Sequence, residues 1–218
     1  MSSVTLLCLK LLSLFLLSYL FGSFPSGYLF FKIKTGGDIR QHGQRKNIGA
    51  TNAFLEGGFR VGALTAVFDI LKGLIPVVFA RHVLGSLTLN NEIAVIICGL
   101  FAVLGHIFPV FIGFKGGTGL STSLGALMGI IPDIIFIFIA ITILLAIITK
   151  RPALMALLMM TAMPFYAYFI GKSQAIITMA AVMSIVYFSV SMTHIGSIMK
   201  GCEYEEFSSK LGRLRIRK

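Results

Sequence analysis

Residues 120–149 read LSTSLGALMGIIPDIIFIFIAITILLAIIT, an almost uninterrupted apolar stretch that is divided once, by Pro132 and Asp133. The stretch forms either one long helix kinked at the proline or two shorter helices that meet there. A helix needs about 20 apolar residues to cross the hydrocarbon core of a bilayer, so each half is short for a span. The choice sets the number of spans, and with it the side of the membrane that the C-terminal part of the chain reaches.

The rest of the chain is apolar as well. Of its 218 residues, 56% are hydrophobic and only 12% are charged, which is far fewer charged residues than soluble domains carry. We therefore predict one all-α integral membrane domain over residues 1–218, with the first window kept as a helix rather than removed as a signal peptide. The other apolar windows are Val4–Phe21, Val61–Phe79, Ile93–Ile112, Ala153–Ile170 and Ala175–Met199.

The distribution of basic residues decides between the two interpretations of residues 120–149. With two helices there are seven spans, and fifteen of the nineteen Lys and Arg residues fall on one side of the membrane. With one kinked helix, Lys150, Arg151 and the tail after residue 200 would move to the opposite side. Because basic loops stay in the cytoplasm, we predict seven transmembrane helices, an outside N-terminus, and residues 201–218 as a basic cytoplasmic tail.

The net charge of +11 does not predict a nucleic-acid partner. In a chain this apolar, excess Lys and Arg normally anchor loops at an anionic cytoplasmic leaflet. Cys8, Cys98 and Cys202 are odd in number and far apart. We therefore expect neither a disulfide framework nor a metal site.

Three segments on the basic side are unusually rich in polar residues and glycine. Residues 22–27 (GSFPSG) break the first helix, which indicates either a packing kink or backbone that lines a cavity. Residues 38–40 and 43–52 combine cations, carboxamides and a hydroxyl, a mixture that suits an anionic headgroup; the alternative is a loop that merely touches lipid phosphates.

Asp69 and Lys72 lie three residues apart in a predicted span. We interpret them as a structural pair whose opposite charges neutralise each other.

The third segment contains GHIFP at 105–109 and FKGGTGLST at 114–122. Its glycines allow successive N–H groups to form an anion-binding nest, and the N-terminus of the next helix would face the same point. Lys115 adds a full charge. Late in the last span, His194 lies one turn from Ser191 and is a candidate for proton chemistry, although a lone histidine near a helix end is more often interfacial.

In this order the segments resemble the bacterial acyl-phosphate:glycerol-3-phosphate acyltransferases, small seven-span enzymes of the inner membrane. The resemblance implies transfer of a fatty acyl group from acyl-phosphate to the 1-hydroxyl of glycerol 3-phosphate, giving lysophosphatidate and phosphate without a metal or cofactor. It implies glycerol 3-phosphate, fatty acyl-phosphate and membrane lipid as partners, and leaves the oligomeric state open. The segments that carry it are residues 22–25, 38–40, 47–52, 69–73, 105–109 and 114–117.

Carried onto this chain, the resemblance implies one set of residues for catalysis and another for the phosphates. His194 and Ser191 are expected to act in catalysis. The expected phosphate-binding residues are Ser23, Arg45, Lys46, Asn47, Thr51, Asn52, His106, Lys115, Gly116, Gly117, Thr118 and Glu203.

Several polar positions depart from the family pattern. Leu55 stands where the family has an arginine, Thr118 replaces a second lysine, and Pro152–Ala156 replaces a serine-containing segment. The family serine before Asn47 is missing, and we hypothesise that Arg45 and Lys46 replace some of the lost charge. These losses leave two alternatives open: a non-enzymatic relative that binds or moves a phosphorylated lipid, and an enzyme with a changed acceptor or donor.

Overall fold

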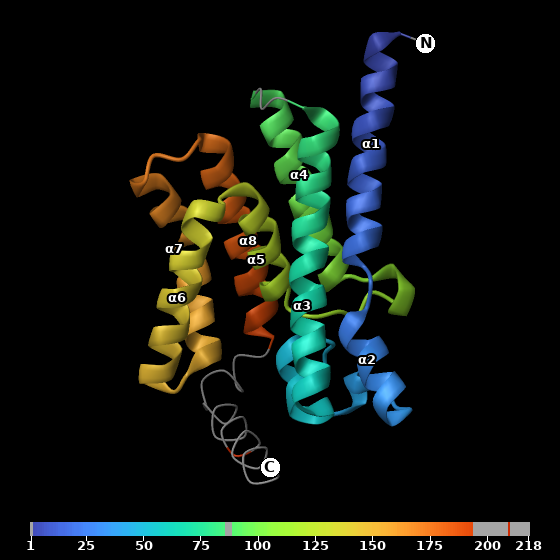
Figure 1. The fold of residues 1–218 in the computed structure, drawn as a ribbon, viewed down its shortest axis with the longest axis vertical. Coiled ribbons are helices and arrows are strands. Elements are labelled where there is room, and N and C mark those ends of the chain that lie inside the picture. The colour runs from blue at the N-terminus through green and yellow to red at the C-terminus, as the bar shows by residue number, and fades with distance from the viewer. Residues whose placement is uncertain (1, 86–88, 194–208, 210–218) are drawn as a thin grey trace.

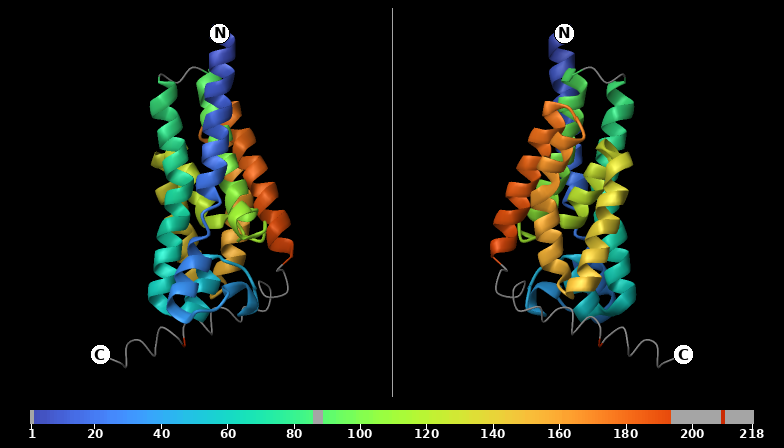
Figure 2. Two further views of the ribbon diagram at one scale, coloured as in Figure 1. Left: turned by 90° about the vertical axis from the view of Figure 1, so that its right-hand side faces the viewer. Right: turned by 90° about the vertical axis from the view of Figure 1, so that its left-hand side faces the viewer.

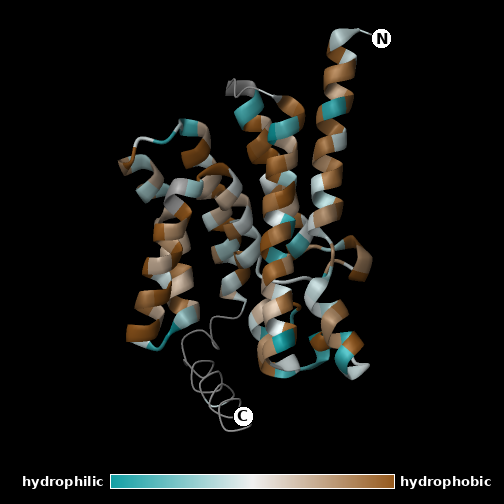
Figure 3. Ribbon diagram, in the orientation of Figure 1, coloured by the Kyte–Doolittle hydropathy of each residue, from teal (hydrophilic) through white to brown (hydrophobic). Residues whose placement is uncertain are grey.

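The computed structural model describes residues 2–85, 89–193 and 209, and in these residues all regular structure is helical (Figure 1). Within these described residues, five segments are long and apolar enough to cross a membrane, and two shorter apolar helices accompany them. Hydrophobic residues make up most of each helix, and hydrophilic residues are commoner near the helix ends (Figure 3). Many large apolar side chains are exposed, while some polar ones, such as Asp69 and Lys72, are buried. The helices are α1 Ser3–Gly22, α2 Ser26–Thr35, α3 Ala50–Leu84, α4 Leu89–Ile107, α5 Leu120–Ile130, α6 Pro132–Thr149, α7 Pro152–Phe169 and α8 Gln174–Met192, with 3-10 turns η1 Ile39–Gln41 and η2 Val110–Ile112.

The stretch 120–149 forms two helices. α5 ends at Ile130 and α6 begins at Pro132, where a proline fits because the first turn of a helix needs no N–H donor. The two helices run in opposite directions (Figure 1). α5 has 11 residues, which at about 1.5 Å per residue cover about half of the hydrocarbon core. The single kinked helix is therefore excluded, and α5 is a half-length helix that begins part-way along the bundle.

The predicted break in the first helix is present. α1 ends at Gly22 and α2 begins at Ser26, because Pro25 has no N–H and cannot continue the helical ladder. The break leaves the carbonyl of Phe24 available, and this carbonyl accepts a hydrogen bond from Nζ of Lys72 at 3.0 Å. The irregular backbone here is thus packed inside the protein.

The predicted second span is longer than the apolar window 61–79. α3 covers Ala50–Leu84 and contains a kink at Gly58, whose φ of 79° is in the left-handed region. α3 packs closely on α5, since a Cβ at Gly73 would overlap the carbonyl of Thr122 and a Cβ at Gly125 would overlap that of Ile70. Small residues that let helix backbones approach are typical of membrane interfaces.

The two ends of the bundle differ in charge. Residues 36–49 and the turn between α6 and α7 lie at one end, and the N-terminus lies at the other (Figures 1 and 2). Most of the basic residues before position 61, together with Lys150 and Arg151, therefore gather at one end, as predicted. The predicted end of the last span at Met199 and the tail 201–218 lie outside the described residues.

Candidate functional site

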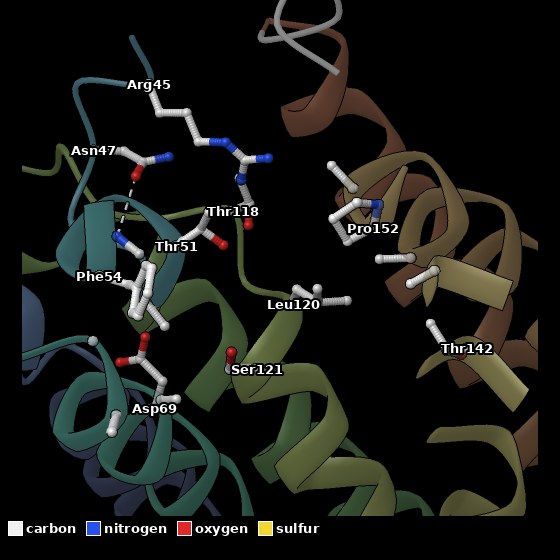
Figure 4. A pocket seen from close by; sticks show the side chains of 18 of the residues that line it. Arg45, Asn47, Thr51, Phe54, Asp69, Thr118, Leu120, Ser121, Thr142 and Pro152 are labelled. Atoms are coloured by element: carbon white, nitrogen blue, oxygen red, sulfur yellow. Dashed lines mark hydrogen bonds between the residues drawn. The ribbon is translucent and has the colours of Figure 1, made fainter. Parts of the chain in front are cut away.

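A cavity of about 550 Å³ lies between α3 and α5 on one side and α6 and α7 on the other. One wall is polar. The side chains of Arg45, Thr51 and Thr118 point into it, together with Asn47 and Ser121 (Figure 4). Asn47 shapes this wall, because its Oδ1 accepts the N–H of Gly49 at 3.2 Å just before α3 begins.

The opposite wall of the cavity is apolar. α6 contributes Ile143 and Ala146, and α7 contributes Ala156 and also Pro152, which is labelled in Figure 4. Apart from Thr142, the side chains of α6 and α7 on this wall carry no polar group. The cavity can therefore hold an anionic group against one wall and a hydrocarbon chain against the other.

The inner end of the cavity carries a cluster of ionisable side chains. Asp69 and His106 both line the cavity and are 1% and 2% exposed. Oδ1 of Asp69 accepts a hydrogen bond from Ser26 Oγ at 2.6 Å, and Nζ of Lys72 lies 2.8 Å from the same oxygen. The sequence interpretation of a neutralising pair is thus confirmed, but Asp69 of this pair also belongs to the wall of the cavity.

A family model described as glycerol-3-phosphate acyltransferase matches residues 12–201. The chain belongs to this acyltransferase family. A protein called glycerol-3-phosphate acyltransferase in Bartonella henselae is 36% identical to it, over 91% of this chain and 90% of its own length. Another of the same name in Geotalea daltonii is 40% identical, over 85% of this chain and 92% of its own length. The fold matches crystal structures of the integral membrane glycerol 3-phosphate acyltransferase PlsY. Its glycerol 3-phosphate form has a TM-score of 0.79 at 29% identity, and its lysophosphatidic acid form has 0.76 at 27%; both cover 88% of this chain and 93% of theirs.

Five of the residues expected to bind phosphate line this cavity, and they come from three parts of the chain. The loop before α3 and its first turn supply three, the end of α4 supplies one, and the glycine-rich segment before α5 supplies the last. They are Arg45, Asn47, Thr51, His106 and Thr118.

Other expected residues are not among those that line the cavity. Ser23 is buried, and its Oγ donates to the carbonyl of Tyr19 at 2.8 Å. Asn52 is buried as well, and its Nδ2 donates to the carbonyls of Asn47, His42 and Ile39 at 2.8, 3.3 and 3.4 Å. Asn52 therefore fixes the loop that carries the polar wall, whereas Ser23 only closes the end of α1. Lys46 and Lys115 are exposed and lie outside the lining of the cavity.

The glycine-rich segment differs from an anion nest. The N–H groups of Gly116 and Gly117 donate to the carbonyls of Ile107 and His106 at 3.1 and 3.2 Å, so they bind the end of α4 instead of facing a ligand. The expectation that these two N–H groups turn toward an anion is wrong. Leu120 and Ser121 at the N-terminus of α5 do line the cavity, and the N-terminus of a helix carries the positive end of its dipole.

The candidates for proton chemistry in the last helix are only partly described. Ser191 is 1% exposed, its Oγ has no hydrogen-bond partner within the described residues, and it is not among the cavity-lining residues. Tyr187, one turn earlier on the same face of α8, does line the cavity. His194 and Glu203 lie outside the described residues, and their expected roles stay predictions.

Sequence reasoning missed Tyr187 and Ser121 as parts of the site. In the sequence Tyr187 precedes Ser191 by four residues and His194 by seven, so the helical spacing was an available signal. Ser121 was interpreted only as the start of a helix. No pattern in the sequence indicated that Thr142 would face the cavity, because it is a single hydroxyl in an otherwise apolar span.

Proposed function

We propose that this chain transfers a fatty acyl group from acyl-phosphate to the 1-hydroxyl of glycerol 3-phosphate, with lysophosphatidate and phosphate as products. The observation that carries the proposal is the two-sided cavity, with Arg45 and hydroxyl groups on one wall and the apolar faces of α6 and α7 on the other. Both substrates carry phosphate and one carries a long hydrocarbon chain. The relatives named as glycerol-3-phosphate acyltransferases support the same activity.

Arg45 supplies the positive charge of the polar wall, while Asn47, Thr51 and Thr118 supply directional polar groups. An arginine and neutral donors together bind phosphate oxygens well. Acyl-phosphate is a mixed anhydride and is already activated for transfer. Holding its carbonyl carbon next to the acceptor hydroxyl, with charge stabilised nearby, therefore supplies a large part of the rate. The reaction needs no cofactor.

For the topology, we propose seven membrane helices, α1 and α3–α8, of which α5 reaches only part-way across, with the N-terminus outside and the C-terminus in the cytoplasm of a bacterial inner membrane. The basic residues at one end of the bundle support this orientation. To test it, Ser2→Cys and Gln41→Cys are introduced separately into a chain whose native cysteines are replaced. An impermeant thiol reagent should label the first in intact spheroplasts and the second only after permeabilisation; the reverse result overturns the orientation.

A second candidate function follows from the lost cations. Thr118 lines the cavity where the family pattern has lysine, and Leu55 is buried where it has arginine. With fewer charges, the cavity is also suited to an acceptor or donor other than glycerol 3-phosphate and acyl-phosphate, or to binding a phosphorylated lipid without reaction.

One assay separates these functions. Purified protein in detergent receives palmitoyl-phosphate and labelled glycerol 3-phosphate, and labelled lysophosphatidate is measured against a protein-free blank. Parallel reactions replace the donor with palmitoyl-coenzyme A or the acceptor with glycerol. Product only with the acyl-phosphate and glycerol 3-phosphate pair supports the proposal. Absence of product from protein that unfolds cooperatively on heating rules it out.

A further inference from the structure

The first part of α3 is folded back on the rest of the helix at Gly58. The backbone of Gly58 has a φ of 79° and a ψ of 178°, a combination that only glycine adopts readily. A Cβ atom on Gly62 would overlap backbone atoms of Phe54, although positions eight residues apart in a straight helix are separated by about 12 Å. Residues 50–57 therefore form a short folded-back segment that packs against the beginning of the longer part of α3.

The folded-back segment carries part of the polar wall of the cavity. Thr51 and Phe54 both line the cavity, and the side chain of Thr51 points into it (Figure 4). Beyond the bend, α3 lines the same cavity with Phe59 and Asp69. The bend at Gly58 therefore sets the position of the polar wall relative to the rest of α3.

α2 packs across this bend and meets both parts of α3. It lies beside the end of α3 that carries the bend (Figure 1). Phe31 of α2 shares one buried apolar cluster with Ala53, before the bend, and Val61, after it. α2 also approaches the loop before α3 closely, since a Cβ atom on Gly27 would overlap the carbonyl of Ile48. The position of the folded-back segment thus depends on its packing against α2.

α2 also makes a polar contact at the bend itself. Nζ of Lys34, in the last turn of α2, donates to the carbonyl of Gly57 at 2.6 Å. A Cβ atom on Gly58 would lie 3.4 Å from the same Nζ. The carbonyl of Gly57 is at the C-terminal end of the folded-back segment, where a cation is favourable, and a charged donor forms a stronger hydrogen bond than a neutral one.

We propose that Lys34 is a positioning residue for substrate binding. By holding the carbonyl of Gly57, it fixes the folded-back segment and with it the part of the polar wall that is proposed to bind glycerol 3-phosphate. Lys34 is not among the described residues that line the cavity, so it acts through the segment and does not touch the substrate. Displacement of a binding group by about 1 Å can cost up to about 100-fold in rate. This assignment rests on the proposed function.

The test compares Lys34→Met with the wild type and with Lys32→Met. Methionine keeps an unbranched side chain and removes the amino group. Lys32 is the matched control, because it is exposed on the same helix and its Nζ donates only within α2, to the hydroxyl of Tyr28 at 3.3 Å. Lys34→Arg keeps a charged donor and is the conservative variant. For each protein, kcat and KM for glycerol 3-phosphate are measured at saturating palmitoyl-phosphate, together with the unfolding midpoint in detergent.

We expect KM for glycerol 3-phosphate to rise about 10-fold in Lys34→Met while kcat changes less than about threefold, since a binding wall shifts and the apolar wall stays in place. Lys34→Arg should recover most of the loss, and KM of Lys32→Met should stay within about twofold of the wild type. A lower unfolding midpoint with an unchanged KM would show a contact that serves stability alone, and it overturns the proposal. Equal rises of KM in the two methionine variants also overturn it, because loss of charge and not of the hydrogen bond would then be the cause.

Hydrogen exchange tests the position of the folded-back segment without turnover. The amide protons of residues 50–57 should exchange about 10-fold faster in Lys34→Met than in the wild type or Lys32→Met, while those of α4 keep their rates. Unchanged exchange in residues 50–57 overturns the proposal. An inactive wild type would remove the proposed function, and the exchange rates would still show whether Lys34 holds the segment.

Discussion

Nζ of Lys72 lies 2.8 Å from Oδ1 of Asp69 inside the bundle, and the two side chains are only 3% and 1% exposed. A lysine within a span is costly, and here the carbonyl of Phe24 and the hydroxyl of Ser26 complete the bonding of the pair. The pair therefore joins three segments of the chain: the break after α1, the start of α2, and the middle of α3.

Lys72→Met should destabilise the protein by about 3–5 kcal/mol, because it leaves a buried carboxylate without its counter-ion. The change is measured as a lower thermal unfolding midpoint in detergent. Lys10→Met is the control, since Lys10 is exposed and only donates to the carbonyl of Val83. Adding Asp69→Asn to Lys72→Met should recover part of the loss. Equal midpoints for Lys72→Met and wild type would contradict the inferred role.

Arg45→Gln should raise KM for glycerol 3-phosphate by about 10- to 100-fold, because a hydrogen bond to a charged group contributes about 1.5–3 kcal/mol. Arg45 lines the cavity, whereas Lys46 is exposed outside it. Lys46→Asn is therefore the matched change. Asparagine tolerates the φ of 47° at this position, and KM should change less than about twofold. If both variants raised KM equally, the charge would act at a distance and not through contact.

Gly117→Ala should abolish most of the activity while the bundle stays folded. A methyl group at this position would overlap Nε2 of His106, so the ring must move out of the wall of the cavity. Gly37→Ala is the comparison, since a Cβ there meets its nearest atom, in His42, at an ordinary 3.5 Å. Product formation and unfolding midpoints are measured for both. Full activity in Gly117→Ala would show that the ring does not depend on this contact.

Asp38→Asn should destabilise the protein in a pH-dependent way. The hydrogen bond from the Arg40 guanidinium holds the pKa of the Asp38 carboxyl below its ordinary value of 3.8. The charged form thus stabilises the fold above pH 3.8, by about 0.5–1 kcal/mol for a partly exposed pair, and this gain is lost as the pH falls through the lowered pKa. Unfolding midpoints of the variant and wild type should differ at pH 7 and converge below pH 3.8. A difference that widens on acidification would have the wrong sign.

The arrangement of helices was largely accessible from the sequence because the bilayer imposes strong rules. The lengths of the apolar windows predicted the positions of most of the helices. The one-sided distribution of Lys and Arg residues predicted that α5 and α6 are two helices, which the proline alone did not decide. The lengths of the helices were harder to predict from the sequence. α3 starts at Ala50, well before its apolar window, because its first turns line the cavity and carry polar residues.

The site was only partly accessible, because residue type does not tell which way a side chain points. Asn52 and Arg40 look like headgroup ligands. In the structure Asn52 binds three carbonyls of its own loop, and Arg40 binds Asp38 and the carbonyl of Ile112. His106 and Asp69 are 37 positions apart, and only the packing of α3 against α4 brings them into contact.

The broken first helix also bears on how the chain enters the membrane. Lys72 adds about 2.5–3.5 kcal/mol to the cost of inserting α3. Asp69, on the same helix, is present from the start, but the carbonyl of Phe24 becomes available only when the broken helix α1–α2 has already settled beside it. During synthesis the first helix thus prepares a docking point for a later one, and α3 should insert poorly in a chain from which residues 3–35 have been removed.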